Sequence, residues 1–166
     1  MPLSTSFDAG CEAVVLKLGE ALRARGAMLT TAESCTGGLI AAVCTSVAGS
    51  SDWFERGFVT YSNAAKTEML GVDAALIAAH GAVSAEVACA MAEGALAHSP
   101  ATLAVAVTGI AGPGGATPGK PVGTVWFALA QRGGAAQAEL LQLNGDRTAV
   151  REQTVVHALQ RLLASI

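Results

Sequence analysis

Residues 101–109, ATLAVAVTG, are the stretch that decides the fold. They form a continuous apolar run of strand length, and such a run is typical of a central strand covered on both faces of its sheet. A sheet of that kind needs helices packed on its two sides. Helical segments are therefore expected elsewhere in the chain.

The residues after this run predict two more strands. A loop rich in glycine and proline covers 109–121, and VGTVWFALA at 122–130 then reads as a strand. The segment AAQAELLQL at 135–143 alternates well enough to be a third. Successive strands without helices between them pair antiparallel, so the sheet is predicted to be mixed rather than wholly parallel.

Helices and strands alternate in the rest of the chain. Together they predict an α/β fold, a three-layer α/β/α sandwich with a mixed central sheet, in one domain over residues 1–166. Two further strands are predicted at 27–33 and 56–62. The predicted helices cover 7–25, ending at Gly26, then 37–47, then 63–98 with breaks at Gly71 and Gly81 and a cap at Ser84, and the last segment from Asp146.

The composition restricts the possible partners. Hydrophobic residues make up 52% of the chain and charged residues 14%, against a usual charged share of about 25%. Such a chain fills a sizeable core and has a lightly charged surface, part of which we expect to meet another subunit in a homo-oligomer, with a dimer favoured. A net charge of -3 gives no electrostatic case for a nucleic-acid or membrane-surface protein.

The sequence predicts a cytoplasmic location. No apolar stretch approaches the roughly 20 residues that span a bilayer. The first ten residues, MPLSTSFDAG, lack the basic region and apolar core of a signal peptide. The four cysteines form no C-x-x-C pair, and reduced cytosolic thiols are the expectation.

A polar cluster, TTAESCTGG at 30–38, stands where a strand ends near Thr31 and a helix begins near Gly37. The turn at the carboxyl end of a strand in an α/β sheet is a favoured ligand site, and the N–H groups of the next helix start are unpaired. Ser34 or Thr36 serving only as a helix cap is the simpler alternative. A cap needs one oxygen, however, and does not account for four successive side chains: Glu33, Ser34, Cys35 and Thr36.

A second polar cluster is TYSNAAKTE at 60–68. It contains Tyr61, the only tyrosine in the chain, and Lys66, which is expected one turn into the next helix. The alternative is an ordinary turn in which Asn63 caps the helix and Lys66 is solvated.

A third cluster, VTGIAGPGGATPGKPVG at 107–123, is rich in glycines, whose N–H groups can form an anion-binding nest. The phosphate-loop motif fails because Pro121 replaces its Ser or Thr and a strand follows. The dinucleotide fingerprint fails because Thr117 occupies its last glycine position. This segment is predicted to be a ligand loop of another kind, with a plain surface hairpin as the alternative.

A fourth cluster is NGDRTAVR at 144–151. Arg147 lies in the first turn of the last helix, where a cation opposes the helix dipole. An arginine at that position suggests a nearby anion, although Asp146 is also placed to pair with it or to cap the helix.

Taken together, these clusters resemble the CinA carboxy-terminal domain, or PncC, family. The resemblance rests on AESCTGG (32–38), GFVTYSNAAK (57–66), AVTGIAGPGG (106–115) with KPVGTVWF (120–127), and GDR (145–147) with Arg151 behind it. It runs from about residue 10 to the C-terminus and implies a stand-alone form of the domain. Ala64 departs from the family, many members of which have Glu at that position.

The resemblance implies hydrolysis of the carboxamide of nicotinamide mononucleotide, a small-molecule nucleotide, with no cofactor and no metal. Ser34 matches the nucleophile, Lys66 the base whose pKa burial must lower, and Tyr61 a residue that relays the proton or orients the lysine. Backbone N–H groups around Cys35, Thr36 and Gly37 are the implied oxyanion hole. The implied substrate contacts are Arg147 to the phosphate, Thr108 to the substrate or the catalytic pair, and also Glu33, Asn63, Gly109, Gly112, Gly114 and Gly115.

Three alternatives stay open at this point. Cys35 is a rival nucleophile, because a thiolate attacks amides and a helix start lowers a thiol's pKa. A non-catalytic module that binds a pyridine nucleotide, or that has a competence-related interaction role, is a second. Hydrolysis of a different carboxamide is a third. The histidines at 80, 98 and 157 lie outside the clusters and lack the spacing of zinc ligands.

Overall fold

A computed structural model describes residues 9–166, and residues 7 and 8 of the first predicted helix lie outside the described residues. Five strands form one sheet in the order β2-β1-β3-β4-β5. The strand β1 is parallel to β2 and β3, whereas β3–β4 and β4–β5 are antiparallel. The predicted mixed sheet is confirmed. Its strands are β1 (Leu29–Glu33), β2 (Phe54–Val59), β3 (Leu103–Gly109), β4 (Thr124–Gln131) and β5 (Gln137–Gln142).

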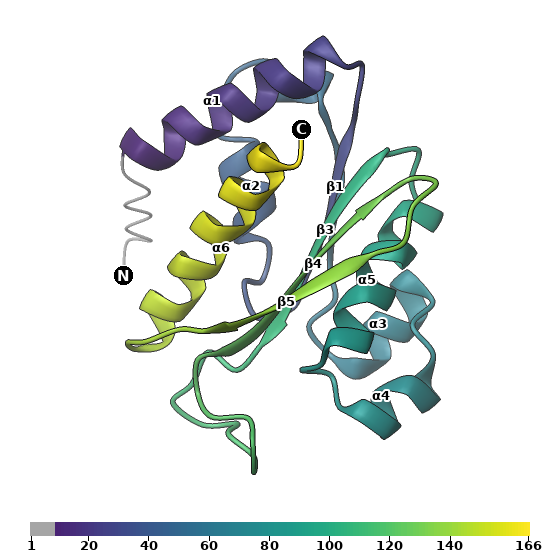
Figure 1. The fold of residues 1–166 in the computed structure, drawn as a ribbon, viewed down its shortest axis with the longest axis vertical. Helices are drawn as coiled ribbons and strands as arrows, with labels where there is room; N and C mark the ends of the chain where they lie inside the picture. The colour runs from purple at the N-terminus through teal and green to yellow at the C-terminus, as the bar shows by residue number, and fades with distance from the viewer. Residues whose placement is uncertain (1–8) are drawn as a thin grey trace.

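Helices cover both faces of the sheet, so the predicted three-layer α/β/α sandwich is confirmed (Figure 1). One layer contains α1 (Ala9–Ala24), α2 (Leu39–Cys44) and α6 (Arg147–Ala164). The other contains α3 (Asn63–Leu70), α4 (Ala74–His80) and α5 (Ala85–Ala97), and a short 3-10 turn covers Ser50–Asp52. Within residues 9–166, no helix combines the length and hydropathy of a membrane span.

The central strand β3 shows why the two layers differ. Its side chains alternate between the two faces, as in any strand. Leu103, Val105 and Val107 belong to the cluster that includes α1, α2 and α6, whereas Ala104 and Ala106 belong to the cluster that includes α5. Small side chains on this second face let α5 pack close to the sheet. Its own buried residues on that side are also mostly small.

The helix ends are capped much as the sequence indicates. Ser84 accepts a hydrogen bond from Val87 N at 3.3 Å, which confirms the predicted cap of α5. Asp146 accepts from Ala149 N at 2.9 Å, so the capping alternative for this residue is correct. Ser62, rather than Asn63, caps α3.

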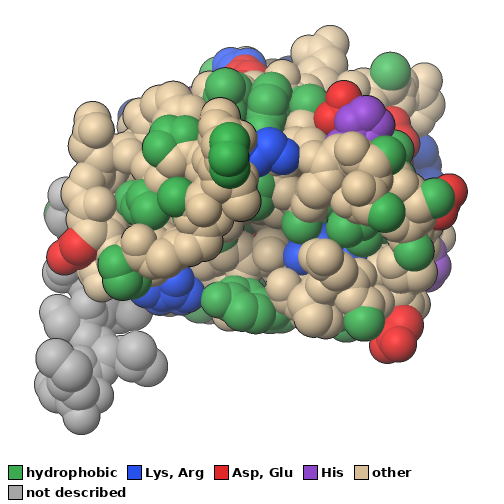
Figure 2. Space-filling view, turned by 90° about the horizontal axis from the view of Figure 1, so that it is seen from below, with side chains coloured by type: hydrophobic (Ala, Val, Ile, Leu, Met, Phe, Trp, Pro, Cys, Tyr) green, Lys and Arg blue, Asp and Glu red, His purple; other side chains and the backbone are tan. Residues whose placement is uncertain are grey.

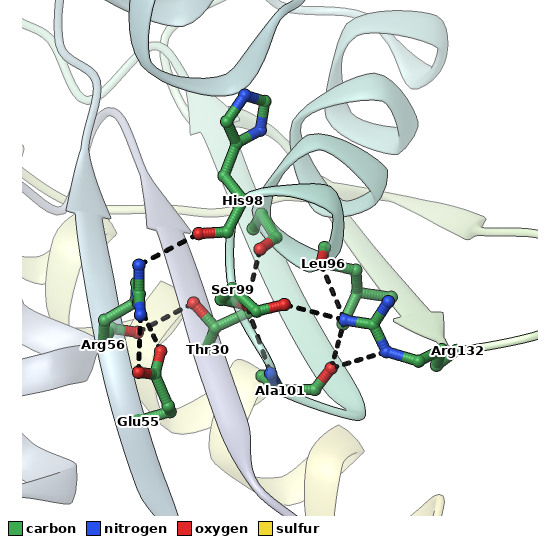
Figure 3. A network of polar contacts seen from close by, with 9 residues as sticks. Thr30, Glu55, Arg56, Leu96, His98, Ser99, Ala101 and Arg132 are labelled. Atoms are coloured by element: carbon green, nitrogen blue, oxygen red, sulfur yellow. Dashed lines mark hydrogen bonds and ion pairs between the residues drawn. The ribbon is translucent and has the colours of Figure 1, made fainter.

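The C-terminal end of α5 is held by two arginines, one in β2 and one directly after β4 (Figure 3). Arg56 donates to the carbonyl of His98 at 3.0 Å. Arg132 donates to the carbonyls of Leu96, Ser99 and Ala101 at distances of 2.7 to 3.0 Å. Cations near the last carbonyls of a helix satisfy unpaired acceptors and favour the helix dipole.

Candidate active site

The carboxyl ends of β1, β2 and β3 meet at one edge of the sheet, where Glu33 stands in register with Val59 and Val107. Ser34 follows β1 directly, and its N–H donates to the carbonyl of Val107 at 3.0 Å. The chain leaves β1 through α2 on one face and leaves β2 through α3 to α5 on the other. Connections that diverge in this way open a crevice at the strand ends, which is the usual ligand site of such sheets.

A cavity of about 250 Å³ lies at this edge, and several predicted site residues line it. Its volume is close to the lower end of the roughly 300–1,000 Å³ found for small-ligand sites. Figure 2 views the molecule from below. Some Lys and Arg side chains lie near the centre of that face and others at its edges, while Asp and Glu lie toward its margin. The lining residues are Ser34, Cys35, Tyr61, Asn63, Lys66, Ala82, Val83, Thr108, Gly109, Ala111 and Arg147.

Ser34 and Lys66 are in direct contact in this cavity. The Nζ of Lys66, in the first turns of α3, lies 3.1 Å from the Oγ of Ser34. Two backbone carbonyls accept hydrogen bonds from the same nitrogen, that of Thr60 at 2.9 Å and that of Tyr61 at 3.3 Å. As an ammonium ion, Lys66 donates all three of these hydrogen bonds. As a neutral amine, it has two N–H donors for the two carbonyls and one lone pair for the serine hydroxyl.

Burial also favours the neutral form of Lys66. Its side chain is 1% exposed, and this burial lowers the pKa of Lys66 below its usual value of 10.5. No carboxylate within residues 9–166 forms an ion pair with it. The arrangement can therefore accept a proton from Ser34, while the two carbonyls stabilise the ammonium ion that results.

The turn after Ser34 presents two backbone donors. No oxygen within residues 9–166 accepts a hydrogen bond from the N–H of Cys35 or of Thr36. The N–H of Gly37, by contrast, donates to the carbonyl of Ser34 at 3.0 Å. The prediction that Gly37 supplies an oxyanion donor is therefore corrected. What Gly37 and Gly38 provide is the tight turn itself, with φ values of +60° and +101° that other residues rarely adopt.

Glu33 is the second correction, because its carboxylate is buried and fully used inside the protein. It accepts hydrogen bonds from Ile40 N at 2.8 Å and Ala41 N at 3.0 Å, at the start of α2. The hydroxyls of Thr36 and Thr31 donate to it at 2.6 and 3.4 Å. Glu33 is 1% exposed and does not line the cavity, so it anchors the turn and does not contact a substrate.

Tyr61 contacts Lys66 through its backbone carbonyl and not through its phenol. Its carbonyl accepts from Lys66, whereas its hydroxyl accepts from the Nη2 of Arg147 at 3.1 Å. The predicted proton relay through the phenol is therefore corrected, since the partner of the hydroxyl is a guanidinium. Arg147 also donates to the carbonyl of Gly112 at 2.9 Å, and both it and Tyr61 line the cavity.

The glycine-rich segment reaches the cavity only at its beginning. Gly109 lines it, but Gly112 is buried, and Gly114 and Gly115 are exposed and lie outside the lining residues. The hydroxyl of Thr108 donates to the carbonyl of Ala82 at 2.9 Å. Thr108 therefore fixes one wall of the cavity, while the lone pairs of its hydroxyl oxygen can accept a hydrogen bond from a ligand.

Two further predicted residues, Asn63 and Cys35, line the cavity. Asn63, the first residue of α3, borders it with an exposed side chain. Cys35 is 6% exposed, and burial raises the pKa of its thiol to about 12, with the nearby Glu33 carboxylate adding to the increase. At neutral pH this cysteine is a thiol, and a thiol is a far weaker nucleophile than a thiolate.

Arg151 and the segment containing Ala82 and Val83 are parts of the site to which the sequence assigns no role. Arg151 donates from Nε to the carbonyl of Cys35 and from Nη2 to that of Thr36, both at 3.1 Å. The spacing of four residues from Arg147 places both guanidiniums on one face of α6. This spacing was the feature of the sequence from which a role for Arg151 near the site could have been predicted. No group of three or more His, Cys, Asp or Glu residues within 9–166 is arranged to hold a metal ion.

Comparisons with known proteins show which proteins the chain is similar to. The family model described as CinA C-terminal domain matches residues 12–166. The chain is 56% identical over 146 residues to the nicotinamide-nucleotide amidohydrolase PncC of Escherichia coli strain K12, covering 88% of each. It is 58% identical over 147 residues to PncC of Pseudomonas putida, covering 89% of this chain and 91% of that one. The solved structure of the competence/damage inducible protein CihA from Agrobacterium tumefaciens matches with a TM-score of 0.92 at 46% identity, over 95% of this chain and 96% of that chain.

Proposed function

The chain belongs to the CinA C-terminal domain family, and from that membership we propose that it is an amidohydrolase of nicotinamide mononucleotide, with Ser34 as the nucleophile and Lys66 as the base. The products are nicotinate mononucleotide and ammonia. The observation that carries the mechanism is the 3.1 Å contact between a buried lysine and the serine hydroxyl.

The first half of the reaction forms an ester on Ser34. Lys66 accepts the hydroxyl proton as Oγ attacks the carboxamide carbon, and the resulting oxyanion accepts hydrogen bonds from the N–H groups of Cys35 and Thr36. The protonated lysine then gives its proton to the departing nitrogen, which leaves as ammonia. The carbonyls of Thr60 and Tyr61 keep the Lys66 nitrogen in place throughout.

The second half of the reaction returns the enzyme to its starting state. Lys66, neutral again, takes a proton from a water molecule as that water attacks the ester carbon. Collapse of the second tetrahedral intermediate breaks the bond to Ser34 Oγ, which recovers its proton from the lysine. One amide and one water are consumed, and one carboxylic acid and one ammonia are formed.

Arg147 is placed to bind the phosphate of the nucleotide. It lines the same cavity as the catalytic pair, and its guanidinium is already oriented by the carbonyl of Gly112. A guanidinium binds phosphate through paired, charge-assisted hydrogen bonds. The hydroxyl of Tyr61, which lies beside it, is a second donor to the same anion.

Ammonia release from nicotinamide mononucleotide, measured for three variants, tests the proposal. Ser34→Ala and Lys66→Met are expected to abolish turnover, whereas Cys35→Ala, which alters a neighbouring cavity residue, is expected to keep most of it. Survival of Ser34→Ala together with loss in Cys35→Ala would transfer the nucleophile to the cysteine. A wild-type protein that binds the nucleotide but releases no ammonia would instead be the non-catalytic module.

Turnover of other carboxamides in the same assay addresses the third alternative. A much higher kcat/KM for a carboxamide that lacks the ribose phosphate would contradict the assignment of the nucleotide as substrate.

A further inference from the structure

The turn that follows Ser34 is held from two sides by opposite charges. On one side, the buried carboxylate of Glu33 accepts from the hydroxyl of Thr36 at 2.6 Å. On the other, Arg151 of α6 donates to the carbonyls of Cys35 and Thr36, each at 3.1 Å. Arg151 does not line the cavity, so its effect on the site passes through these two carbonyls.

These contacts determine where the N–H groups of the turn point. A peptide unit is planar and trans, so the N–H of one residue points away from the carbonyl of the residue before it. Because the carbonyl of Cys35 faces Arg151, the N–H of Thr36 points away from Arg151. Likewise, the carbonyl of Ser34 faces the N–H of Gly37, so the N–H of Cys35 points the other way.

We propose that Arg151 is a positioning residue for the reaction, which holds two successive peptide units of the turn. The first, Cys35–Thr36, carries the N–H of Thr36, and the second, Thr36–Gly37, carries the N–H of Gly37, which bonds the carbonyl of Ser34 and so orients the N–H of Cys35. In this way the N–H groups of Cys35 and Thr36 are aligned to receive the oxyanion. The proposal rests on the function proposed above. A guanidinium suits the task because its planar fork meets two carbonyl oxygens at once, whereas a lysine ammonium is a single point of charge. Its positive charge also polarises both peptide units, which strengthens their N–H groups as donors.

Steady-state kinetics of Arg151→Met and Arg151→Lys test this role. Misplacing the oxyanion donors of the turn is expected to lower kcat of Arg151→Met about 100-fold, the usual loss for one oxyanion donor, with KM within about threefold of wild type. Arg151→Lys keeps the charge but reaches one carbonyl at a time, so a loss of about 10-fold is expected.

Arg132→Met is the matched control, because Arg132 also donates to backbone carbonyls but lies at the far end of α5 (Figure 3). Its kcat is expected to equal that of wild type at a temperature where all variants are folded. The proposal is overturned if Arg151→Met keeps kcat within threefold, if its KM rises while kcat is unchanged, or if both methionine variants lose kcat equally.

Amide hydrogen exchange separates this proposal from the proposed function. In Arg151→Met the amide of Gly37, which bonds the carbonyl of Ser34, is expected to exchange at least tenfold faster, while amides of β3 are unchanged. If wild type released no ammonia, the proposed function would fail, and this exchange alone would decide the role of Arg151. An unchanged Gly37 amide would then refute it.

Discussion

Replacing Glu33 by glutamine keeps the shape of the side chain and removes the charge that anchors the turn. The carboxylate accepts from the backbone N–H groups of Ile40 and Ala41 with separate oxygens, at 2.8 and 3.0 Å. A glutamine has one carbonyl oxygen and one NH₂ group, so in either orientation one backbone N–H faces another donor. We therefore expect Glu33→Gln to destabilise the protein strongly.

The size of the effect follows from these contacts. One buried donor left unpaired costs about 1–3 kcal/mol, and the remaining hydrogen bonds lose the share of their strength that the charge supplies. A total of about 3 kcal/mol is a reasonable sum of these two effects. For a chain of this length, each kcal/mol lowers Tm by about 2–4 °C, so the expected decrease is about 6–12 °C.

Thermal unfolding followed by circular dichroism measures this decrease, and Asp52→Asn provides the matched control. That substitution removes the same charge from a side chain that is 65% exposed and paired with Arg23 at 3.3 Å. Exposed pairs contribute about 0–1 kcal/mol, so its Tm should stay within about 4 °C of wild type. Equal Tm values for the two variants would show that the Glu33 carboxylate does not anchor the turn.

Three further results are expected. Burial lowers the pKa of Lys66 below 10.5, and the lysine must lose its proton before it can accept one from the serine. The value of kcat/KM should therefore rise with pH and level off at a pH below 10.5. A profile that falls with rising pH would contradict the base role. Arg147→Ala should raise KM for nicotinamide mononucleotide at least tenfold but leave kcat/KM for the riboside, which lacks the phosphate, nearly unchanged; equal losses for both substrates would rule out a phosphate contact. Gly94→Ala would place a methyl group 2.1 Å from the carbonyl oxygen of Leu70, so the free energy of unfolding in urea should fall by about 1–3 kcal/mol. For Gly134→Ala the nearest atom would be 3.6 Å away, and the free energy of unfolding should not fall.

Most of the fold could be predicted because strands and helix ends leave local patterns of apolar and capping residues in the sequence. The apolar run of β3 identified a strand buried on both faces, and Ser84 was predicted correctly as a cap. For Asp146, capping was one of two alternatives, and the structure shows that it caps α6. The strand order was not predicted, because it depends on which connections cross which face of the sheet. The single domain over residues 1–166, the homo-oligomer and the cytoplasmic location stay predictions.

The site was predicted where a residue acts through its own side chain and misread where its role depends on a distant partner. Ser34 and Lys66 meet as expected. Tyr61 was assigned a proton relay because its phenol is its most reactive group, yet the position of Arg147, 86 residues later, occupies that hydroxyl. Gly37 was assigned as a donor because it stands at the end of the turn, but the turn closes on its N–H.

The proposed catalytic pair and the residue proposed to position its turn come from all three layers of the sandwich. Ser34 extends the central sheet, Lys66 belongs to the layer of α3, and Arg151 reaches the turn from the opposite layer of α6. A covalent reagent that reacts with activated serines should therefore label Ser34 only in molecules in which both helical layers are packed on the sheet. The labelled fraction would then measure the fraction of completely folded molecules. Partly folded chains, whether newly synthesised or damaged by heat, should not react with the reagent and should not catalyse the proposed reaction.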